Sequence, residues 1–272
     1  MTDKPKPKIQ PPAISPESYT REYFECWCQG ANEFKVSYGM YLPLRLQKII
    51  NLAKIREGDW VLDVGCGRGE LVLHCAMRGA QALGIDYASS ALELAQEITR
   101  KLDNDIKKNM GFIKSDARFL PFPERLFDVV FMIDVVEHLT PDELDQSLQE
   151  IRRVLKENGR FIIHTMPNLW YYKFIYPLYR LFQGLRGIKL PVDPRDRWQF
   201  KEVHVNEQTP VSLYRFLRKN GFRAKVFLES TQTYETEKNI LVRKIMIILT
   251  KLPVFKLLFC NDIFAVATKT RK

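Results

Sequence analysis

The stretch that decides the fold is Val61-Leu62-Asp63-Val64-Gly65-Cys66-Gly67-Arg68-Gly69, in which an apolar run leads into three alternating glycines. The apolar run predicts a buried strand over residues 60–64, and the pattern of residues 70–78 predicts a helix directly after the glycines. Glycines in such a turn let the backbone bend sharply and approach a ligand that a Cβ would block. The stretch therefore predicts a strand, a glycine turn and a helix that together face a small molecule.

The side chain at position 70 helps to choose the ligand. A dinucleotide-binding turn of the GxGxxG type needs glycine or alanine where this chain has Glu70. A negative side chain at a helix N-terminus also disfavours a pyrophosphate. We therefore expect a ligand with an amine, whose ammonium group Asp63 can address directly or through water.

The flanking sequence repeats the alternation of strand and helix. Strands are predicted at 60–64, 82–85, 111–113, 127–133, 160–164, 224–228 and 263–267, and helices at 70–78, 89–102, 141–156 and 210–220. Strands separated by helices of this length are typical of right-handed crossovers and a parallel sheet covered on both faces. The fold class is α/β.

Composition and length limit the domain organisation. The chain has 272 residues, of which 46% are hydrophobic and 27% charged, so it can bury one sizeable core. Proline and lysine over residues 1–18 predict a disordered tail, and residues 19–272 are expected to form a single domain. Its core is predicted at 42–168, 210–229 and 262–268, with insertions at 168–209 and 230–261. The long insertions are expected to be functional.

The remaining compositional features concern location. Five cysteines without CxxC spacing predict neither a disulfide framework nor a zinc site, which favours reduced cytosol. The N-terminus lacks the pattern of a secretory signal, and no stretch of about 18 uncharged apolar residues is present. We expect a cytoplasmic chain with no membrane-spanning helix.

Two further acidic residues follow the next strands. Asp86 ends the second predicted strand, where nucleotide-type sites place the acceptor of ribose hydroxyls. Asp116 follows the third, where a carboxylate can accept from an exocyclic adenine amine. Each alone is more often a helix cap. Together with Asp63 and the glycine turn, they predict a pocket for a cation, a ribose and an adenine.

These residues carry a resemblance to a known family. Residues 42–168 resemble class I S-adenosylmethionine-dependent methyltransferases, the broad type that includes quinone-biosynthesis methyltransferases, and residues 116–130 are similar to that group's adenine-site loop. The resemblance implies a Rossmann-like, doubly wound sheet of seven strands, mostly parallel with the last strand antiparallel, here with helical cap insertions. It also implies S-adenosyl-L-methionine as the cofactor.

The resemblance assigns roles to ten residues by position. Gly65, Cys66 and Gly67 would contact the methionine part of the cofactor with Asp63 behind them. Asp86 would hold the ribose hydroxyls, and Tyr87 would flank the adenine. The adenine edge would meet Asp116 and Ala117, and the pocket near the reactive sulfonium would be lined by Ile133 and Asp134.

Methyl transfer from a sulfonium is an in-line displacement, so the protein mainly aligns the reacting atoms. A general base is needed only for a poor nucleophile such as a hydroxyl. His138 and His204 are the candidates for this role, or for hydrogen bonding to the substrate, whereas His74 is expected to be structural. The alternative is that both orient a loop.

Two motifs bear on the reaction. Asp134-x-x-Glu137-His138 resembles the element by which some O-methyltransferases hold a divalent ion, yet Glu-His-Leu here is common in metal-free relatives, so we expect no metal. The fourth strand does not end in the Asn/Asp-Pro-Pro-aromatic run of amino-methyltransferases that act on bases. An O or C acceptor is therefore favoured over an exocyclic amine.

The net charge of +10 is unevenly spread. Residues 1–160 carry 22 basic and 24 acidic side chains, whereas residues 161–272 carry 20 and 8. The excess lies in the insertions, where segments 168–191 and 239–260 combine basic residues with aromatic and aliphatic ones. They are predicted to form either a lid over the active site or helices at an anionic membrane surface, with nucleic acid as a less favoured partner.

Both favoured alternatives predict a lipophilic or lipid-linked acceptor. The function expected from the sequence is methyl transfer to an O or C atom of such a molecule. A soluble small-molecule O-methyltransferase with a hydrophobic lid, an RNA methyltransferase and a non-catalytic cofactor-binding module are the alternatives. The sequence does not indicate the oligomeric state.

Overall fold

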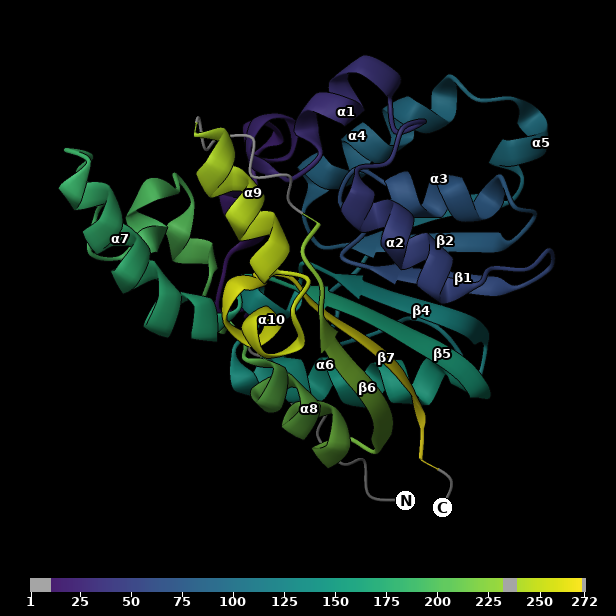
Figure 1. Cartoon of the computed structure of the whole chain (residues 1–272). Helices are drawn as coiled ribbons and strands as arrows, with labels where there is room; N and C mark the ends of the chain where they lie inside the picture. The colour runs from purple at the N-terminus through teal and green to yellow at the C-terminus, as the bar shows by residue number, and fades with distance from the viewer. Residues whose placement is uncertain (1–10, 232–238, 271–272) are drawn as a thin grey trace.

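Seven strands form one sheet in the computed structural model, in the order β3-β2-β1-β4-β5-β7-β6 (Figure 1). The structure describes residues 11–231 and 239–270. The strands are β1 (Trp60–Val64), β2 (Gln81–Asp86), β3 (Met110–Lys114), β4 (Phe127–Ile133), β5 (Leu155–Thr165), β6 (Phe222–Leu228) and β7 (Ile263–Lys269). β7 runs antiparallel to both β5 and β6, and the other pairs are parallel. The predicted Rossmann-like sheet, with its last strand antiparallel, is confirmed.

Helices cover both faces of the sheet, with α2 and α3 on one side and α6 and α8 on the other (Figure 1). Their bounds are α1 (Ala31–Ser37), α2 (Leu44–Ala53), α3 (Glu70–Ala76), α4 (Ser89–Arg100), α5 (Asn104–Lys107), α6 (Pro141–Val154), α7 (Tyr176–Leu185), α8 (Pro210–Lys219), α9 (Ile240–Leu249) and α10 (Pro253–Phe259). Single turns of π-helix occur at η2 (Tyr23–Trp27) and η4 (Tyr171–Ile175). Two short 3-10 turns, η3 (Val136–His138) and η6 (Lys201–Val203), matter for the site.

The central strand β4 explains why the two helical layers hold together. Its side chains alternate between two apolar clusters, with Val130 and Met132 in one and Val129 and Phe131 in the other, and all four are fully buried. A strand buried on both faces reads as a continuous apolar run, as this one does. The strand order reverses between β1 and β4, which pair with each other, so the connections that leave these two strands run in opposite directions and leave a crevice at their carboxyl ends.

Local sequence signals set the helix that follows the crevice. The Thr140 hydroxyl accepts from the backbone N–H of Glu143, and the Glu143 carboxylate accepts from the backbone N–H of Thr140. This capping box fixes where α6 begins, because it satisfies two N–H groups that the first helical turn leaves unpaired. It therefore fixes the short connection between β4 and α6 that borders the crevice.

The two insertions stand at the carboxyl end of the sheet and meet at their bases (Figure 1). The Asn168 side chain donates to the carbonyls of Leu257 and Cys260 at 3.2 and 3.0 Å, and its backbone N–H donates to the carbonyl of Asn261. Asn168 is completely buried. The insertion that carries α7 and the one that carries α9 and α10 are thus tied together where they leave the sheet.

Candidate functional site

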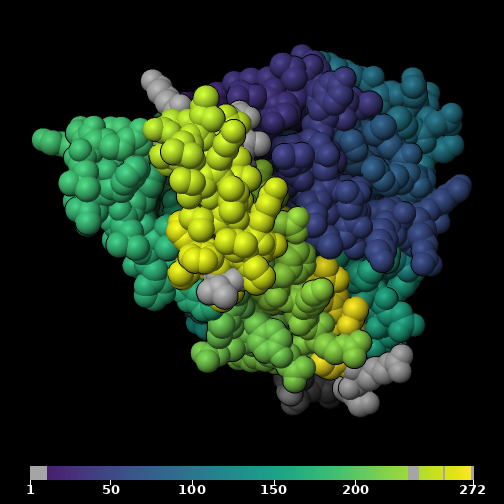
Figure 2. Space-filling model, viewed as in Figure 1, coloured from purple at the N-terminus to yellow at the C-terminus, as the bar shows by residue number. Residues whose placement is uncertain are grey.

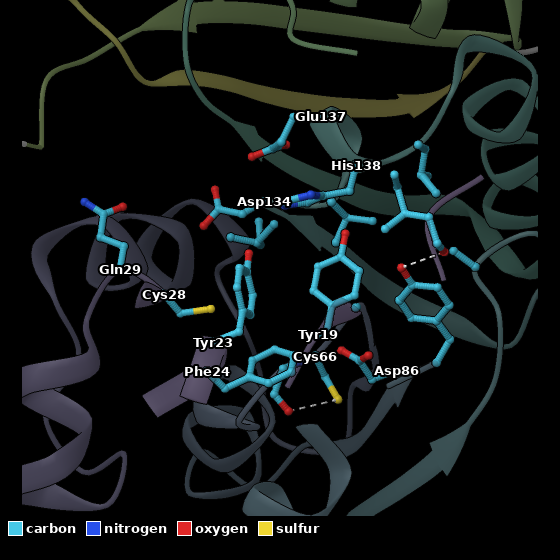
Figure 3. A pocket seen from close by; sticks show the side chains of 18 of the residues that line it. Tyr19, Tyr23, Phe24, Cys28, Gln29, Cys66, Asp86, Asp134, Glu137 and His138 are labelled. Carbon is cyan, nitrogen blue, oxygen red and sulfur yellow. Dashed lines mark hydrogen bonds between the residues drawn. The ribbon is translucent and has the colours of Figure 1, made fainter. Parts of the chain in front are cut away.

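A cavity of about 540 Å³ opens at the carboxyl ends of β1, β2 and β4. This is a common size for a small-molecule pocket. All twelve residues singled out from the sequence line it: Asp63, Gly65, Cys66, Gly67, Asp86, Tyr87, Asp116, Ala117, Ile133, Asp134, His138 and His204. Figure 3 shows several of them facing a common space. Their roles toward a ligand stay predictions, but the fold brings every one of them to the same cavity.

The glycine turn forms the floor of the cavity. Gly65 and Gly67 have φ values of +73° and +51°, a region that residues with a Cβ rarely adopt. A Cβ at Gly65 would lie 2.4 Å from Cγ2 of Val135. The Gly65 and Cys66 N–H groups both donate to the carbonyl of Ile85 at 2.8 Å, which holds the turn against β2. Glycine is therefore required here by conformation, and at Gly65 also by space.

Asp63 lies behind this turn and is 3% exposed. Among the described residues, its Oδ1 atom has no hydrogen-bond partner. Burial, with the nearby carboxylates of Glu70 and Asp86, raises the pKa of Asp63 to about 8. A buried carboxylate without a partner is costly, and a cation supplied by a ligand would relieve the cost. The residue therefore fits the amine-bearing ligand that the sequence predicts.

Asp86 makes hydrogen bonds within the protein. Its two carboxylate oxygens accept from the N–H groups of Gly67 and Ala88, each at 2.9 Å. Burial raises its pKa to about 6, and these backbone hydrogen bonds oppose the rise. Each carboxylate oxygen can accept a second hydrogen bond. Asp86 can therefore hold the turn in place and still receive the hydroxyls of a ribose.

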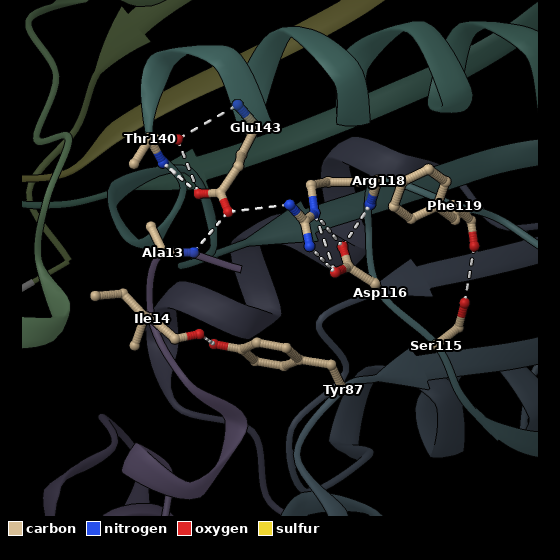
Figure 4. Close-up of polar contacts among 9 residues, drawn as sticks. All are labelled: Ala13, Ile14, Tyr87, Ser115, Asp116, Arg118, Phe119, Thr140 and Glu143. Atoms are coloured by element: carbon tan, nitrogen blue, oxygen red, sulfur yellow. Dashed lines mark hydrogen bonds and ion pairs between the residues drawn. The ribbon is translucent and has the colours of Figure 1, made fainter. Parts of the chain in front are cut away.

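The carboxylate predicted to meet an adenine is engaged by an arginine (Figure 4). Asp116 makes a two-pronged ion pair with Arg118, whose closest contact is 2.7 Å, and Arg118 is 3.3 Å from Glu143. Arg118 is 5% exposed, so this pair is largely shielded from water. Asp116 lines the cavity, but its charge is compensated before a ligand arrives.

The N-terminal segment differs from the predicted disordered tail. Residues 1–10 lie outside the described part of the chain, but residues 11–18 run along the cavity. The Ala13 N–H donates to Glu143 at 2.8 Å, and the Ile14 carbonyl accepts from the Tyr87 hydroxyl at 3.5 Å (Figure 4). Proline favours extended chain, and a chain of this kind can still be held by a backbone hydrogen bond to a fixed carboxylate.

Residues 19–28 cover the cavity, and no sequence pattern predicts this position for them. Tyr19 and Tyr23 lie between His138 and the glycine turn in Figure 3. Buried Arg68, within the turn, donates to the carbonyls of Phe24 and Gln29 at 2.7 and 3.1 Å. The many aromatic residues of this segment are a sequence signal that it packs against something. The hydrogen bonds of Arg68 have no such signal, because their acceptors are backbone carbonyls, which every residue has.

Four aromatic residues from two distant segments line the cavity, and we call them the aromatic wall: Tyr23, Trp27, Trp198 and Phe200. Phe200 stacks edge-on against Tyr23 with ring centroids 5.2 Å apart, and it contacts Trp27 at 6.2 Å. The wall therefore joins the N-terminal segment to the first insertion. Such rings offer an apolar surface to whatever occupies this side of the cavity.

The two candidate histidines meet although 66 positions separate them, with ring centroids 4.7 Å apart. The carbonyl of Val203 accepts from Nδ1 of His138 at 2.9 Å. A carbonyl cannot donate, so Nδ1 carries the proton and Nε2 keeps its lone pair. Burial lowers the pKa of His138 to about 4 and that of His204 to about 3. Both rings are therefore neutral near pH 7.

The other two histidines, His74 and His164, do not line the cavity. His74 bonds the carbonyl of Gly39 at 2.9 Å, in line with its predicted structural role. His164 is fully buried between Asp134 and Asp262, with ring nitrogens 2.5 and 3.3 Å from their carboxylates. Buried Arg45 forms an ion pair with the same Asp134. Asp134, which has a φ of +54°, is thus held from two sides at the end of β4.

The Asp134, Glu137 and His138 side chains each bond to a different partner. Glu137 is 1% exposed and accepts from the Thr165 hydroxyl at 2.7 Å, and burial raises its pKa. Its backbone carbonyl accepts from the N–H groups of Val205 and Asn206, which draws the first insertion toward the cavity. Across residues 11–231 and 239–270, no three His, Cys, Asp or Glu side chains are grouped to hold a metal ion.

The chain is similar in sequence to known methyltransferases. Residues 62–163 match a family described as a methyltransferase domain. The chain is 29% identical over 174 residues to a ubiquinone/menaquinone biosynthesis C-methyltransferase of Azotobacter vinelandii, covering 60% of this chain and 67% of that protein. It is 30% identical over 113 residues to a sterol 4-C-methyltransferase of Caenorhabditis elegans, covering 42% and 33%.

Among solved structures, a methyltransferase from Archaeoglobus fulgidus described as S-adenosylmethionine-dependent superposes with a TM-score of 0.55 at 24% identity, over 83% of this chain and 91% of that one. This likeness supports the fold. The chain spans between one third and two thirds of the first curated relatives it matches. The matched family region begins in β1, contains the glycine turn, and ends in β5, before the first insertion.

Proposed function

We propose that this chain, which carries a class I S-adenosylmethionine-dependent methyltransferase domain, moves a methyl group to an O or C atom of a lipophilic or lipid-linked small molecule. The observation that carries the proposal is that one cavity has two kinds of lining. Asp63, the glycine turn and Asp86 supply polar groups, and the aromatic wall supplies apolar rings. A polar, amine-bearing cofactor and an apolar acceptor suit these two kinds of lining.

The residues present fit S-adenosyl-L-methionine as the cofactor. Asp63 has a buried oxygen atom without a partner among the described residues, which an ammonium group would satisfy. The positive φ values of Gly65 and Gly67 bring the backbone of the turn beside the cavity, and Asp86 retains lone pairs for ribose hydroxyls. The bound cofactor supplies an electrophilic methyl group on a sulfonium. The chain's own task is to position that group and the acceptor, which can lower a barrier by about 7–11 kcal/mol.

We assign the role of base to His138 where the acceptor is a hydroxyl. Its Nδ1 proton is held by the Val203 carbonyl, so Nε2 is the atom that can accept a proton. The lowered pKa keeps the ring neutral, with the Nε2 lone pair unprotonated, at any pH above about 5. His204 packs on the His138 ring and on Trp198, at centroid distances of 4.7 and 4.9 Å, and so links the base to the aromatic wall.

The first insertion and the names of the relatives both support a lipophilic acceptor. Matching proteins are named for ubiquinone, menaquinone and sterol methylation, and one is named a 27-O-demethylrifamycin SV methyltransferase. The aromatic wall supports an apolar acceptor for this chain too. We propose further that the enzyme meets its acceptor at the inner face of a membrane as a peripheral protein. No helix within residues 11–231 and 239–270 is long and apolar enough to cross a bilayer.

The test is transfer of a labelled methyl group. The full chain is incubated with methyl-labelled S-adenosylmethionine and a total lipid extract, and the organic phase is counted and analysed by mass. The proposal predicts label in an organic-soluble product that gains one methyl group. Label confined to RNA or to water-soluble products, or no transfer to any extract, would contradict it.

A further inference from the structure

Helix α7 turns an apolar stripe toward solvent. Leu178, Leu181 and Leu185 are 64%, 65% and 82% exposed, and their spacing of three and four residues places them on one helical face. Phe174 precedes them by four residues and is also exposed. The residues of α7 that are buried are Tyr176 and Gln183, on another side of the helix. The pattern is the reverse of a normal surface helix, which turns its apolar face inward.

Helix α9 repeats this feature. Leu241, Ile245 and Ile248 are exposed at the same helical spacing, and Leu252 continues the stripe beyond the end of the helix. None of the ten residues of α9 is buried. Val242, Met246 and Leu249, on another side of the helix, are half-buried, and α9 contacts α10, so α9 packs on that side and leaves the stripe exposed. Exposed apolar patches of this kind mark sites of contact with another surface.

Positive charge accompanies both stripes. Residues 168–192 and residues 239–261 each carry four basic side chains, and neither segment contains an Asp or Glu. These are Lys173, Arg180, Arg186 and Lys189 in the first segment, and Arg243, Lys244, Lys251 and Lys256 in the second. We call the two stripes with these cations the apolar–basic face. All the charged side chains of residues 168–192 and 239–261 are basic.

The two helices belong to one side of the molecule. Figure 2 shows the segments of α7 and α9 neighbouring each other on the same view, and α10 packs against η4, the turn that precedes α7. The first insertion also continues from α7 through exposed Val192 to Trp198 in the aromatic wall. The α7 part of the apolar–basic face and Trp198 of the aromatic wall therefore belong to one segment of chain, the first insertion.

We propose that the apolar–basic face docks on an anionic lipid leaflet, with α7 and α9 lying in the interface. An anionic leaflet offers both negative headgroups for the cations and an apolar layer for the stripes. A second copy of this chain would bring eight cations against eight like charges, and a nucleic acid would leave the leucines in water. The site of docking deepens the proposed function, because a leaflet that seats this face would present its lipids beside the aromatic wall.

The experiment is flotation of the full chain with vesicles, without cofactor or acceptor. Phosphatidylcholine vesicles are compared with vesicles that contain about one third phosphatidylglycerol, at low and high salt. We expect the protein to float with the anionic vesicles and not with the neutral ones. Floating should weaken as salt increases, because the contribution of the cations is screened.

Two sets of variants locate the face. Leu181→Ser with Ile248→Ser removes one apolar group from each stripe and should weaken partition more than tenfold, from the loss of buried apolar area. Lys173→Gln with Lys244→Gln should weaken it about 25-fold, since each exposed cation near an anionic surface contributes about fivefold. The matched control is Met77→Ser with Ile113→Ser, which changes an exposed apolar residue at the end of α3 and one on the edge strand β3, and it should float as the wild type does.

Each result has one meaning for the proposal. Thermal unfolding of every variant first confirms that it is folded, and exposed substitutions of this kind should change stability little. Absence of flotation with anionic vesicles, or equal loss in the control variant, would overturn the inference. So would a dimer in solution that the Leu181→Ser, Ile248→Ser variant dissociates, because a second copy would then occupy the face.

The test is separate from that of the proposed function. A chain that floats but transfers no methyl group refutes the enzymatic proposal and leaves the docking face standing. A chain that methylates an acceptor in detergent but does not bind vesicles refutes the docking face alone.

Discussion

The two sides of the cavity differ in how the chain builds them. The glycine turn, Asp63 and Asp86 come from 24 consecutive positions at the ends of two adjacent strands, which hydrogen bonds of the sheet hold in register. The aromatic wall joins Tyr23 and Trp27 to Trp198 and Phe200, from segments more than 170 positions apart. The first side lies on a rigid sheet, and the second is assembled by loops. We infer that the sheet holds the cofactor and that the loops choose the acceptor.

The largest effect is expected at the base that we assign. His138→Gln should lower the rate of transfer to a hydroxyl acceptor about 100-fold or more, which is the usual contribution of a positioned base. Cofactor affinity should stay near the wild-type value. His74→Gln serves as the control, because His74 bonds Gly39 away from the cavity. Equal loss in both variants, measured with the same acceptor, would remove the role of His138.

The next largest effects are expected at Asp63, where one substitution should weaken cofactor binding and raise the stability of the unliganded protein. Asp63→Asn should weaken binding of S-adenosylhomocysteine, measured by calorimetry, about 10- to 100-fold, because a buried charged hydrogen bond contributes about 1.5–3 kcal/mol. The same variant should be more stable than the wild type at pH 8 without ligand. Weaker binding without that stabilisation would count against the assigned pKa.

The direction of this stability change follows from the linkage between proton binding and folding. Burial raises the pKa of Asp63 to about 8 in the fold, above its ordinary value of 3.8. The folded protein therefore holds a proton that the unfolded chain loses, and the contribution of Asp63 to the free energy of unfolding declines as pH rises from about 4 to about 8. Asparagine has no such proton, so the difference in melting temperature should grow across this range.

Arg68 links the two sides, so its loss should have an intermediate effect. Arg68→Met removes two hydrogen bonds to the carbonyls of Phe24 and Gln29. We expect the N-terminal cover to open more often and the dissociation rate of S-adenosylhomocysteine to rise about tenfold, as the loss of one or two hydrogen bonds predicts. Hydrogen exchange should quicken over residues 19–29 and stay unchanged in β4. Exchange that quickens equally in both would indicate general loss of stability instead.

The smallest expected effect is an absence of pH dependence. His138 and His204 have pKa values lowered to about 4 and 3 by burial, so neither changes charge between pH 6 and pH 8. The rate at saturating cofactor and acceptor should therefore show no step near the ordinary histidine value of 6.5. A clear step there, abolished by His138→Gln, would show that this ring is more exposed in the working enzyme.

The same contrast explains how far the sequence could predict the structure. Period-2 and period-3.6 patterns place the seven strands and the main helices, because burial on the sheet dictates them. Asp63, Asp86 and Asp116 follow directly from strand ends. The cover by Tyr19 and Tyr23 depends on backbone carbonyls that accept from Arg68, and the pairing of His138 with His204 depends on Val203. Backbone contacts between distant segments have no counterpart in a residue pattern.

The same limit applies to Asp116. Its place at a strand end predicts an open carboxylate, but Arg118 two residues later folds back on it. Arginine in that position could equally have pointed to solvent. The N-terminal prolines likewise predict an extended chain, and only the fixed Glu143 carboxylate decides that residues 11–18 lie on the cavity.

The division of labour between the two sides is tested most directly at Trp198, which contacts His204 and Tyr172 in the first insertion. Trp198→Ala is compared with the wild type for two quantities in one preparation: the affinity for S-adenosylhomocysteine and the rate of labelled methyl transfer to the organic phase. We predict an affinity within about twofold of the wild type and a transfer rate lowered at least tenfold, since burial of an aromatic ring contributes about 3 kcal/mol or more. Equal losses in both quantities, or an unchanged transfer rate, would contradict the account.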